Sequence, residues 1–345
     1  MHANKVSLFD DFDFPQNALV QMISATWISR SIYVAAKLGI ADLLKDGQKN
    51  YGEIASLTQT DENALFRLLR ALSSLGVFIE KEPGNFALTA TANLLRSDVS
   101  DSLRAYAIML GEQDYEAWKF LAHSIKTGES AFKKSYGVEV FEYFKRHPEA
   151  AGNFNAAMTS YSSMAIPAIV SSYDFSTTNV LVDIAGGTGS LITSILEAYP
   201  SLQGILFELP PVIEKASPVI STTEVSDRCQ LVAGNFFESI PQGGDVYLLK
   251  HILHNWNDES VLSILRNCRQ AMAASSKLLL IEHLILPGNE PCFGKLVDVS
   301  MLVWCKGGKE RTEVEYANLL DLAGFKLVGV IATQTSLSIL EAVPK

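Results

Sequence analysis

The chain has 345 residues, of which 48% are hydrophobic and 19% charged, and its formal net charge is −10. This length is enough for two domains with a sizeable core, and the composition excludes a wholly disordered chain. The negative charge disfavours nucleic acid and anionic membranes as partners, because both would repel such a surface.

The N-terminal segment and the cysteines predict where the chain resides. The stretch MHANKVSLFDDFDF is acidic and lacks the basic and apolar regions of a signal peptide. No window holds about 18 uncharged apolar residues in a row, as a membrane-spanning helix requires. We expect a cytoplasmic protein in a reducing compartment, because the cysteines have neither a metal-binding spacing nor the density of a disulfide scaffold. They are Cys229, Cys268, Cys292 and Cys305.

The first third of the chain predicts helices followed by a hairpin. The pattern favours a helix over residues 17–44, with more apolar surface than one stripe requires. A second helix begins at Thr60 or Asp61, and two short strands flank the turn residues at 83–85. This order predicts a mainly helical, winged-helix-like domain over residues 1–105.

DNA binding and dimerisation are the two functions that we consider for this domain. The helix that would enter a DNA groove offers only Arg67 and Arg70, and the hairpin carries Glu80 and Glu82 beside Lys81. Acidic side chains would repel DNA phosphates, so the pattern favours a packing or dimerisation module.

Residues 106–172 are predicted to be helical and rich in aromatic side chains. Such rings more often fill a core than line a ligand site, but a segment that joins two domains is also where small ligands bind. We expect this segment to line the substrate cleft. Met158 and Tyr161 lie one helical turn apart and are candidate substrate contacts.

Three glycines follow a predicted buried strand at residues 180–184 and precede a predicted helix at residues 190–199. In the turn AGGTG, a ligand can approach the backbone because glycine has no Cβ, and the helix N-terminus adds free amide donors. A second strand, GILFE, ends at Glu208, where an acid can accept hydrogen bonds from two ribose hydroxyls. The turn therefore predicts a nucleoside cofactor.

Two residues favour S-adenosylmethionine over a dinucleotide. Ile192 stands where a dinucleotide fingerprint has its third glycine. Asp183, at the end of the first strand, would repel a pyrophosphate but attract a cationic amine, which S-adenosylmethionine carries.

The rest of the chain continues to alternate strands and helices. This alternation predicts a doubly wound α/β sheet over residues 173–345, with ligands at the carboxyl ends of its strands. Asn235 and Phe236 could contact the edge and the face of an adenine, or could equally be a loop residue and a core ring. The further predicted strands are QLVAGNFFESIP (230–241), DVYLLKHILHNWNDE (245–259) and residues 277–282, 325–331 and 337–342, with a helix over residues 312–323.

Seven motifs occur in an order that resembles a known family: SRSIYVAAKLGIADLL, RLLRAL, FNAAM, VDIAGGTG, LKHILHNWNDE, IEHLILP and GGKERTEVEY. The chain is similar over nearly its whole length to the class I S-adenosylmethionine-dependent O-methyltransferases of the plant caffeic-acid and flavonoid type and their bacterial relatives acting on polyketides. The resemblance implies a Rossmann-like catalytic domain and a homodimer built through the N-terminal helices. It implies S-adenosylmethionine as cofactor, S-adenosylhomocysteine as product and no metal.

The resemblance also implies which residues form the site. The catalytic base maps onto His254, and its two flanking carboxylates map onto Glu282 and Glu310. Candidate cofactor residues are Asp183, Ala185, Gly186, Gly187, Gly189, Glu208, Asn235, Phe236, Lys250 and Ser162, and candidate substrate contacts are Met158, Tyr161, Asn255, Trp256 and Met301.

Three of these positions depart from the family pattern. Ala185 replaces the first of three usual glycines, which is harmless where only its carbonyl is used. Asn235 and Asn255 stand where aspartate is usual. Asn235 can still accept a hydrogen bond from an adenine amino group, whereas Asn255 changes the expected substrate contact.

Methyl transfer to oxygen requires alignment of the reactants and removal of a hydroxyl proton, and histidine suits the second task because its pKa lies near neutrality. We expect Glu282 to hold the imidazole nitrogen that does not act as base, and Glu310 to contact the imidazole from the other side. The alternative for both acids is a surface salt bridge with Lys306, Lys309 or Arg311.

Other functions remain as alternatives at this point. His251 and His254 with Asp258 nearby lack a third ligand at a persuasive spacing, so we expect no metal. One rival is a member of the same fold that binds S-adenosylmethionine but catalyses another reaction on a natural product, and a second is a winged-helix regulator with a small-molecule sensor domain. The presence of His254 favours methyl transfer to a phenolic or enolic hydroxyl of an aromatic or polyketide-like natural product of secondary metabolism.

Overall fold

The structure is a computed structural model that describes residues 14–345. The acidic segment 1–13, where we expect no signal peptide, lies outside the described residues. Within residues 14–345, none of the helices combines the length and the apolar character needed to cross a membrane.

The chain folds into two compact units. The predicted connecting segment 106–172 is shared between them, because its residues alternate between the units along the chain. The first unit comprises the chain up to Tyr115 and Pro148–Tyr161, and the second comprises Glu116–His147 and Ser162–Lys345.

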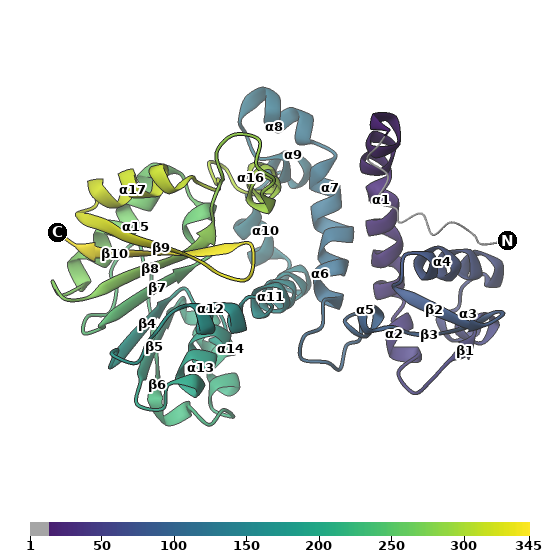
Figure 1. Cartoon of the computed structure of the whole chain (residues 1–345), viewed down its shortest axis with the longest axis horizontal. Coiled ribbons are helices and arrows are strands. Elements are labelled where there is room, and N and C mark those ends of the chain that lie inside the picture. Colours follow the sequence, from purple (N-terminus) through teal and green to yellow (C-terminus); the bar gives the residue numbers. More distant parts are fainter. Residues whose placement is uncertain (1–13) are drawn as a thin grey trace. The chain divides into compact units, whose positions relative to one another are not determined.

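The first unit consists of helices around a small three-stranded sheet, of which the sequence predicts the two strands of the hairpin but not the third (Figure 1). Helix α4 (Glu62–Ser74) begins where Asp61 accepts a hydrogen bond from the amide of Ala64, and it buries three leucines at helical spacing. The sheet has the order β1-β3-β2, and Gly84 takes a φ of 79° in the turn between β2 and β3. The other elements are α1 (Pro15–Lys37), α2 (Ile40–Leu43), β1 (Lys49–Asn50), α3 (Tyr51–Thr58), β2 (Phe78–Glu82), β3 (Asn85–Leu88), α5 (Ala90–Asn93), α6 (Arg104–Met109), the π-helix η1 (Leu110–Asp114) and α11 (Pro148–Ser163), whose last two residues belong to the second unit.

Helix α1 is apolar on more than one side, as its sequence predicts. Only Ala35 and Ala36 are buried, while several large apolar side chains near its start are exposed in the single chain. A helix of this kind usually packs against further helices or a second subunit. The exposed side chains are Leu19, Val20, Met22, Ile23 and Trp27.

The second unit is built on a seven-stranded sheet of order β6-β5-β4-β7-β8-β10-β9. Its first five strands are parallel, and β10 runs antiparallel to both β8 and β9. Two apolar cores lie on the two faces of this sheet, so both faces are covered, as a doubly wound fold requires. The strands are β4 (Val180–Ile184), β5 (Gln203–Glu208), β6 (Cys229–Ala233), β7 (Val246–Lys250), β8 (Lys277–His283), β9 (Phe325–Ala332) and β10 (Leu337–Pro344).

Helices α13 and α14 cover one face of the sheet, and α15 and α17 cover the other (Figure 1). Strand β4 and helix α13 meet at the glycine-rich turn, which places that turn at the carboxyl edge of the parallel strands. The helices are α7 (Tyr115–Trp118), α8 (Leu121–Thr127), α9 (Ala131–Tyr136), α10 (Val140–Arg146), α12 (Ile166–Ser172), α13 (Ser190–Ala198), α14 (Pro210–Ile220), α15 (Asp258–Ala271), α16 (Phe293–Trp304), α17 (Glu313–Leu322) and the 3-10 helices η2 (Ser226–Arg228) and η3 (Leu253–Asn255).

Two predicted strands are too long. The strand predicted over residues 230–241 ends at Ala233, because a turn follows in which the backbone carbonyl of Asn235 accepts hydrogen bonds from the amides of Glu238 and Ser239. The strand predicted over residues 245–259 ends at Lys250, because His251 takes a left-handed φ of 56°. The short helix η3 and the start of α15 occupy the remainder of that stretch.

Candidate active site

The glycine-rich turn after β4 is held by Glu208 at the end of β5. The amide of Gly187 donates a hydrogen bond of 3.2 Å to Glu208 Oε2, and the amide of Leu209 donates one of 2.7 Å to Glu208 Oε1. A Cβ on Gly186 would lie 2.4 Å from Asp183 Oδ2, so this position requires glycine. The structure thus brings Glu208 and the turn together, as the sequence predicts.

Asp183 is a buried carboxyl group with one unsatisfied oxygen. Its Oδ2 atom has no hydrogen-bond partner among the residues that the structure describes. Burial raises the pKa of Asp183 to about 7, although the nearby positive charge of Lys250 opposes this shift. A buried carboxylate without a partner is costly, and a cationic amine placed beside it would offset that cost.

Lys250 and Ser162 are joined by a hydrogen bond from the ammonium to the hydroxyl. Burial lowers the pKa of Lys250, while the negative charges of Asp183 and Glu282 oppose this shift. Lys250 therefore lies within electrostatic reach of both the predicted cofactor acid and one of the predicted catalytic acids.

Asn235 and Phe236 form contacts within their own loop and the neighbouring aromatic cluster. The Asn235 side chain accepts a hydrogen bond from the amide of Phe237 and donates one to Glu238. The ring of Phe236 lies edge-on to Trp256, with centroids 6.2 Å apart. Their assignment to an adenine site stays a prediction.

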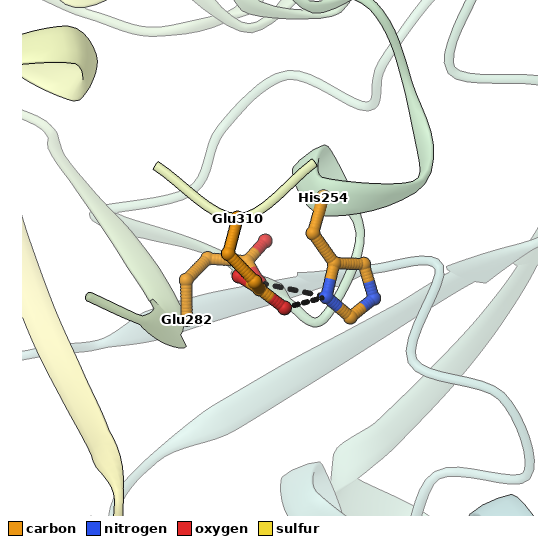
Figure 2. Close-up of side chains that lie close together, drawn as sticks. All are labelled: His254, Glu282 and Glu310. Atoms are coloured by element: carbon orange, nitrogen blue, oxygen red, sulfur yellow. Dashed lines mark hydrogen bonds and ion pairs between the residues drawn. The ribbon is translucent and has the colours of Figure 1, made fainter. Parts of the chain in front are cut away.

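His254 lies in η3, just after β7, with both predicted acids beside it. Its Nδ1 atom lies 2.7 Å from Glu310 Oε1 and 3.6 Å from Glu282 Oε2 (Figure 2). Glu282 Oε1 also accepts hydrogen bonds from the backbone amides of Ile252 and Leu253. The three side chains come from η3, β8 and the segment before α17, and all three are buried.

Glu282 and Glu310 are not placed around the His254 imidazole as we expect from the sequence. We expect Glu282 to hold one imidazole nitrogen with Glu310 on the other side, but both carboxylates lie on the Nδ1 side and Glu310 makes the short contact. Figure 2 shows Nε2 of His254 pointing away from both acids. Glu282 lies farther from the imidazole than Glu310 because its carboxylate also accepts two hydrogen bonds from the backbone of the turn before His254.

His254, Glu282 and Glu310 form one buried cluster, and its two acids determine the pKa of the histidine. Burial lowers the pKa of His254, but the negative charges of Glu282 and Glu310 outweigh burial and raise it above its ordinary value. Burial raises the pKa of Glu282 to about 7. A neutral His254 that donates its Nδ1 proton to Glu310 keeps the Nε2 lone pair available as a base.

The surface salt bridges that we consider as the alternative for these acids are absent from the described residues. Glu282 and Glu310 are buried, and the two lysines pair elsewhere: Lys306 with Glu129, and Lys309 with Asp258 and Glu315. Arg311 is itself buried and binds Asp258.

Three ligand atoms of His254, Glu282 and Glu310 lie within 4.8 Å of one another, a spacing at which such groups can hold a cation. The contact of 2.7 Å between His254 and Glu310 within this group has the geometry of a hydrogen bond that orients the imidazole. The set His251, His254 and Asp258 that the sequence suggests is not brought together, because Asp258 pairs with Arg311 and Lys309.

The predicted substrate contacts are divided between the two units. Asn255 donates a hydrogen bond to the His251 carbonyl and lies 3.7 Å from Cys305 Sγ. Trp256 stacks on Phe141, and Met301 lies half-buried in α16. Met158 and Tyr161 lie in the first unit on α11, where Tyr161 stacks on Tyr106 with ring centroids 5.1 Å apart. Their roles stay predictions.

Sequence reasoning missed two residues that hold the site together. Asp298 of α16 accepts a hydrogen bond from the backbone amide of Glu310. Arg311 binds backbone carbonyls on both sides of His254. A charged residue directly beside a predicted catalytic acid in GGKERTEVEY is the signal that points to Arg311.

The sequence matches the family model of the O-methyltransferase domain over residues 118–326 and that of the O-methyltransferase dimerisation domain over residues 20–98. It is 46% identical over 326 residues to phenazine O-methyltransferase PhzM of Lysobacter antibioticus, covering 94% of this chain and 95% of that protein.

Solved structures agree with these matches. The crystal structure of LaPhzM superposes with a TM-score of 0.92 at 45% identity, covering 96% of this chain and 100% of that one. The O-methyltransferase NcsB1 from neocarzinostatin biosynthesis was solved with S-adenosylmethionine and 2-hydroxy-5-methyl naphthoic acid. It superposes with a TM-score of 0.77 at 30% identity, covering 92% of this chain and 96% of that one.

Proposed function

The chain belongs to the O-methyltransferase family, whose members depend on S-adenosylmethionine, and on this premise we propose that it methylates a phenolic or enolic hydroxyl of a small aromatic natural product, with His254 as the general base. The observation that carries the proposal is the buried hydrogen bond of 2.7 Å between His254 Nδ1 and Glu310 Oε1. It orients the imidazole so that Nε2 points away from the acids (Figure 2).

The chemistry assigned to the chain is the removal of one proton. When bound, S-adenosylmethionine would supply a methyl group on a positively charged sulfur, which would leave with the electron pair of its bond to that carbon, as neutral S-adenosylhomocysteine. Nε2 of His254 accepts the hydroxyl proton of the acceptor, and the oxygen keeps the electron pair that forms the new bond to carbon. Glu310 and Glu282 stabilise the imidazolium that results.

The cofactor is assigned to the turn at 185–189 and its neighbours. Asp183, with its unsatisfied buried oxygen, would hold the ammonium of the methionine part, and Glu208 would accept hydrogen bonds from the ribose hydroxyls. Ser162 and Lys250 would border the same site from the side of β7. The known complex of NcsB1 with a hydroxylated naphthoic acid supports an aromatic hydroxy compound as the acceptor class.

The dimerisation domain indicates a homodimer. We place the contact between the two copies on helix α1, because its exposed apolar side chains would otherwise remain in water.

The test separates cofactor binding from methyl transfer. Purified wild type, Glu208→Ala and His254→Gln would be titrated with S-adenosylmethionine by calorimetry, and transfer of a tritiated methyl group would be measured with a panel of hydroxylated aromatic acceptors. We expect Glu208→Ala to lose binding, and His254→Gln to bind the cofactor but lose transfer.

Two results would contradict the proposal. Wild type that binds the cofactor but methylates no member of the panel would favour a non-methylating reaction on the same fold. Full transfer by His254→Gln would remove the assignment of the base.

A further inference from the structure

Arg311 is a fully buried cation directly beside the catalytic cluster, with an exposed fraction of 0%. Its Nε and Nη2 atoms lie 3.0 Å and 2.7 Å from Asp258 Oδ1. Its Nη1 atom donates to the carbonyl of Leu253 at 3.1 Å, and its Nη2 atom donates to the carbonyl of Trp256 at 2.8 Å. A buried charge is costly unless it is paired and hydrogen-bonded, and this guanidinium meets both conditions.

The turn that carries His254 is held from two sides. Glu282 accepts hydrogen bonds from the amides of Ile252 and Leu253, just before the base. On the other side, the amide of Lys309 donates a hydrogen bond of 2.8 Å to the carbonyl of His254 itself. Arg311 binds the carbonyls of the residues one before and two after the base, so the turn cannot tilt without breaking one of these bonds.

Each residue of the segment 309–311 therefore binds His254 or the backbone around it, and all three residues are charged. Lys309 binds the backbone of His254, Glu310 binds its side chain, and Arg311 binds the backbone around it. The segment is itself fixed, because the Arg311 carbonyl accepts a hydrogen bond from the amide of Ile285, just beyond β8.

We propose that Arg311, anchored by Asp258, is a positioning residue that sets both the orientation and the proton affinity of the base, by holding the turn around His254 and by placing one buried positive charge beside that turn. The inference rests on the proposed function, because it takes His254 to be the base. It extends that function to a residue that does not touch the reacting atoms.

The charge part of this role follows from the groups around His254. The two glutamates raise the pKa of His254, and the positive charge of Arg311 lowers it. The positive charge of Arg311 thus opposes the effect of the two glutamates on the proton affinity of the base. The titratable and charged groups that face the cluster are Glu282 and His283 of β8, Glu310 and Arg311, His251 of the same turn, Lys250 at the end of β7, Asp298 of α16 and Tyr316 of α17.

The alternative is that Arg311 only stabilises the fold. Loss of a purely structural ion pair would lower stability and the amount of active enzyme, but it would leave the pH at which activity rises unchanged. If Arg311 has the proposed role, removing the charge of Arg311 and removing the charge of Asp258 should shift the proton affinity of His254 in opposite directions. Removing the charge of Arg311 raises the proton affinity of His254, whereas removing the charge of Asp258 leaves Arg311 less neutralised and lowers it.

The experiment measures kcat against pH at saturating S-adenosylmethionine for wild type, Arg311→Met, Arg311→Lys and Asp258→Asn. Asp321→Asn, which removes an exposed acid of α17, is the matched control. We expect the rise of activity with pH to move to higher pH in Arg311→Met and to lower pH in Asp258→Asn. Arg311→Lys should keep the wild-type profile with kcat reduced about 10-fold, because lysine retains the charge but not the planar fork.

Cofactor affinity and folding are measured in the same preparations. Unchanged binding of S-adenosylmethionine would show that the variants are folded. If Arg311→Met does not fold, Asp258→Asn still decides, because asparagine removes the negative charge but keeps an Oδ1 atom that can accept both hydrogen bonds from Arg311. An unshifted profile in Asp258→Asn, or shifts in the same direction for both variants, would overturn the proposal.

Failure of the proposed function gives a different result. In that case His254→Gln would retain the wild-type rise of activity with pH, whatever Arg311 does. A profile that depends on His254 but not on Arg311 or Asp258 would leave the base assigned and reject only the positioning role.

Discussion

The backbone amide of Gly187 and the carboxylate of Glu208 are joined by a hydrogen bond of 3.2 Å, which ties the glycine-rich turn after β4 to the end of β5. Two segments separated by 21 residues in the sequence thus form one edge of the proposed cofactor site. Each side chain at this edge can be tested by its effect on binding alone.

Glu208→Gln should weaken binding of S-adenosylmethionine by about 10- to 100-fold, because a charged acceptor for two hydroxyl donors becomes a neutral one. Calorimetric titration measures this, with the exposed Glu214→Gln on α14 as control. Burial raises the pKa of Glu208, so wild-type affinity should also fall as the pH is lowered and the carboxylate takes up a proton. Equal affinities in Glu208→Gln and wild type would contradict the assignment.

Glu310→Gln should reduce kcat by about 10- to 100-fold, because the imidazolium formed during the reaction loses its nearest negative charge. The same change lowers the pKa of His254, so the rise of activity with pH should move to lower pH. The exposed Glu313→Gln, three residues along, is the control for steady-state kinetics over a pH series. A reduced kcat with an unshifted profile would indicate that Glu310 acts only by orientation.

Asp183 should make the stability of the ligand-free protein depend on pH. Burial raises its folded-state pKa from 3.8 to about 7, so the folded state binds the proton more tightly than the unfolded state. The contribution of Asp183 to the free energy of unfolding is therefore favourable at low pH and is lost as the pH rises toward about 7.

Urea unfolding of wild type and Asp183→Asn at several pH values measures this contribution as a difference. We expect Asp183→Asn to gain stability relative to wild type as the pH rises, and Asp227→Asn, an exposed acid, to show no such trend. If the difference in free energy of unfolding between wild type and Asp183→Asn did not change with pH, the pKa of Asp183 would be the same in the folded and the unfolded state. S-adenosylmethionine should reduce the difference by pairing with the carboxylate.

Trp27→Glu should dissociate the dimer. Trp27 is 72% exposed in the single chain and lies on the apolar surface of α1. A charge there would have to be desolvated at the contact between the two copies. Light scattering after size-exclusion chromatography measures the mass. Val328→Glu, an equally apolar exposed position on β9, should remain dimeric. A dimeric Trp27→Glu would place the contact elsewhere.

Much of the catalytic unit could be predicted because its signals are local. Strand β4 is a continuous apolar run that ends at the glycines, and its predicted bounds of 180–184 are confirmed. The family membership of the chain, to which the resemblance points, is likewise confirmed. In the first unit, the predicted helix cap at Asp61 and the predicted turn at Gly84 are confirmed.

The arrangement around His254 could not be predicted, because it depends on distant segments. The left-handed backbone of His251 ends β7, and Glu282 and Glu310, from two segments further along the chain, both approach the Nδ1 atom of His254. The sequence suggests that Arg311 lies on the surface. Its burial depends on the carbonyls of Leu253 and Trp256, which accept its hydrogen bonds and which only the folded chain brings close to it.

The long sequence separation within the catalytic cluster has a consequence for how the enzyme forms. The contact between His254 and Glu310 closes a loop of 56 residues that contains β8. The bond between Gly187 and Glu208 closes a much shorter loop on adjacent strands. Shorter loops close at lower entropic cost, so in a refolding chain the bond between Gly187 and Glu208 should form before the contact between His254 and Glu310.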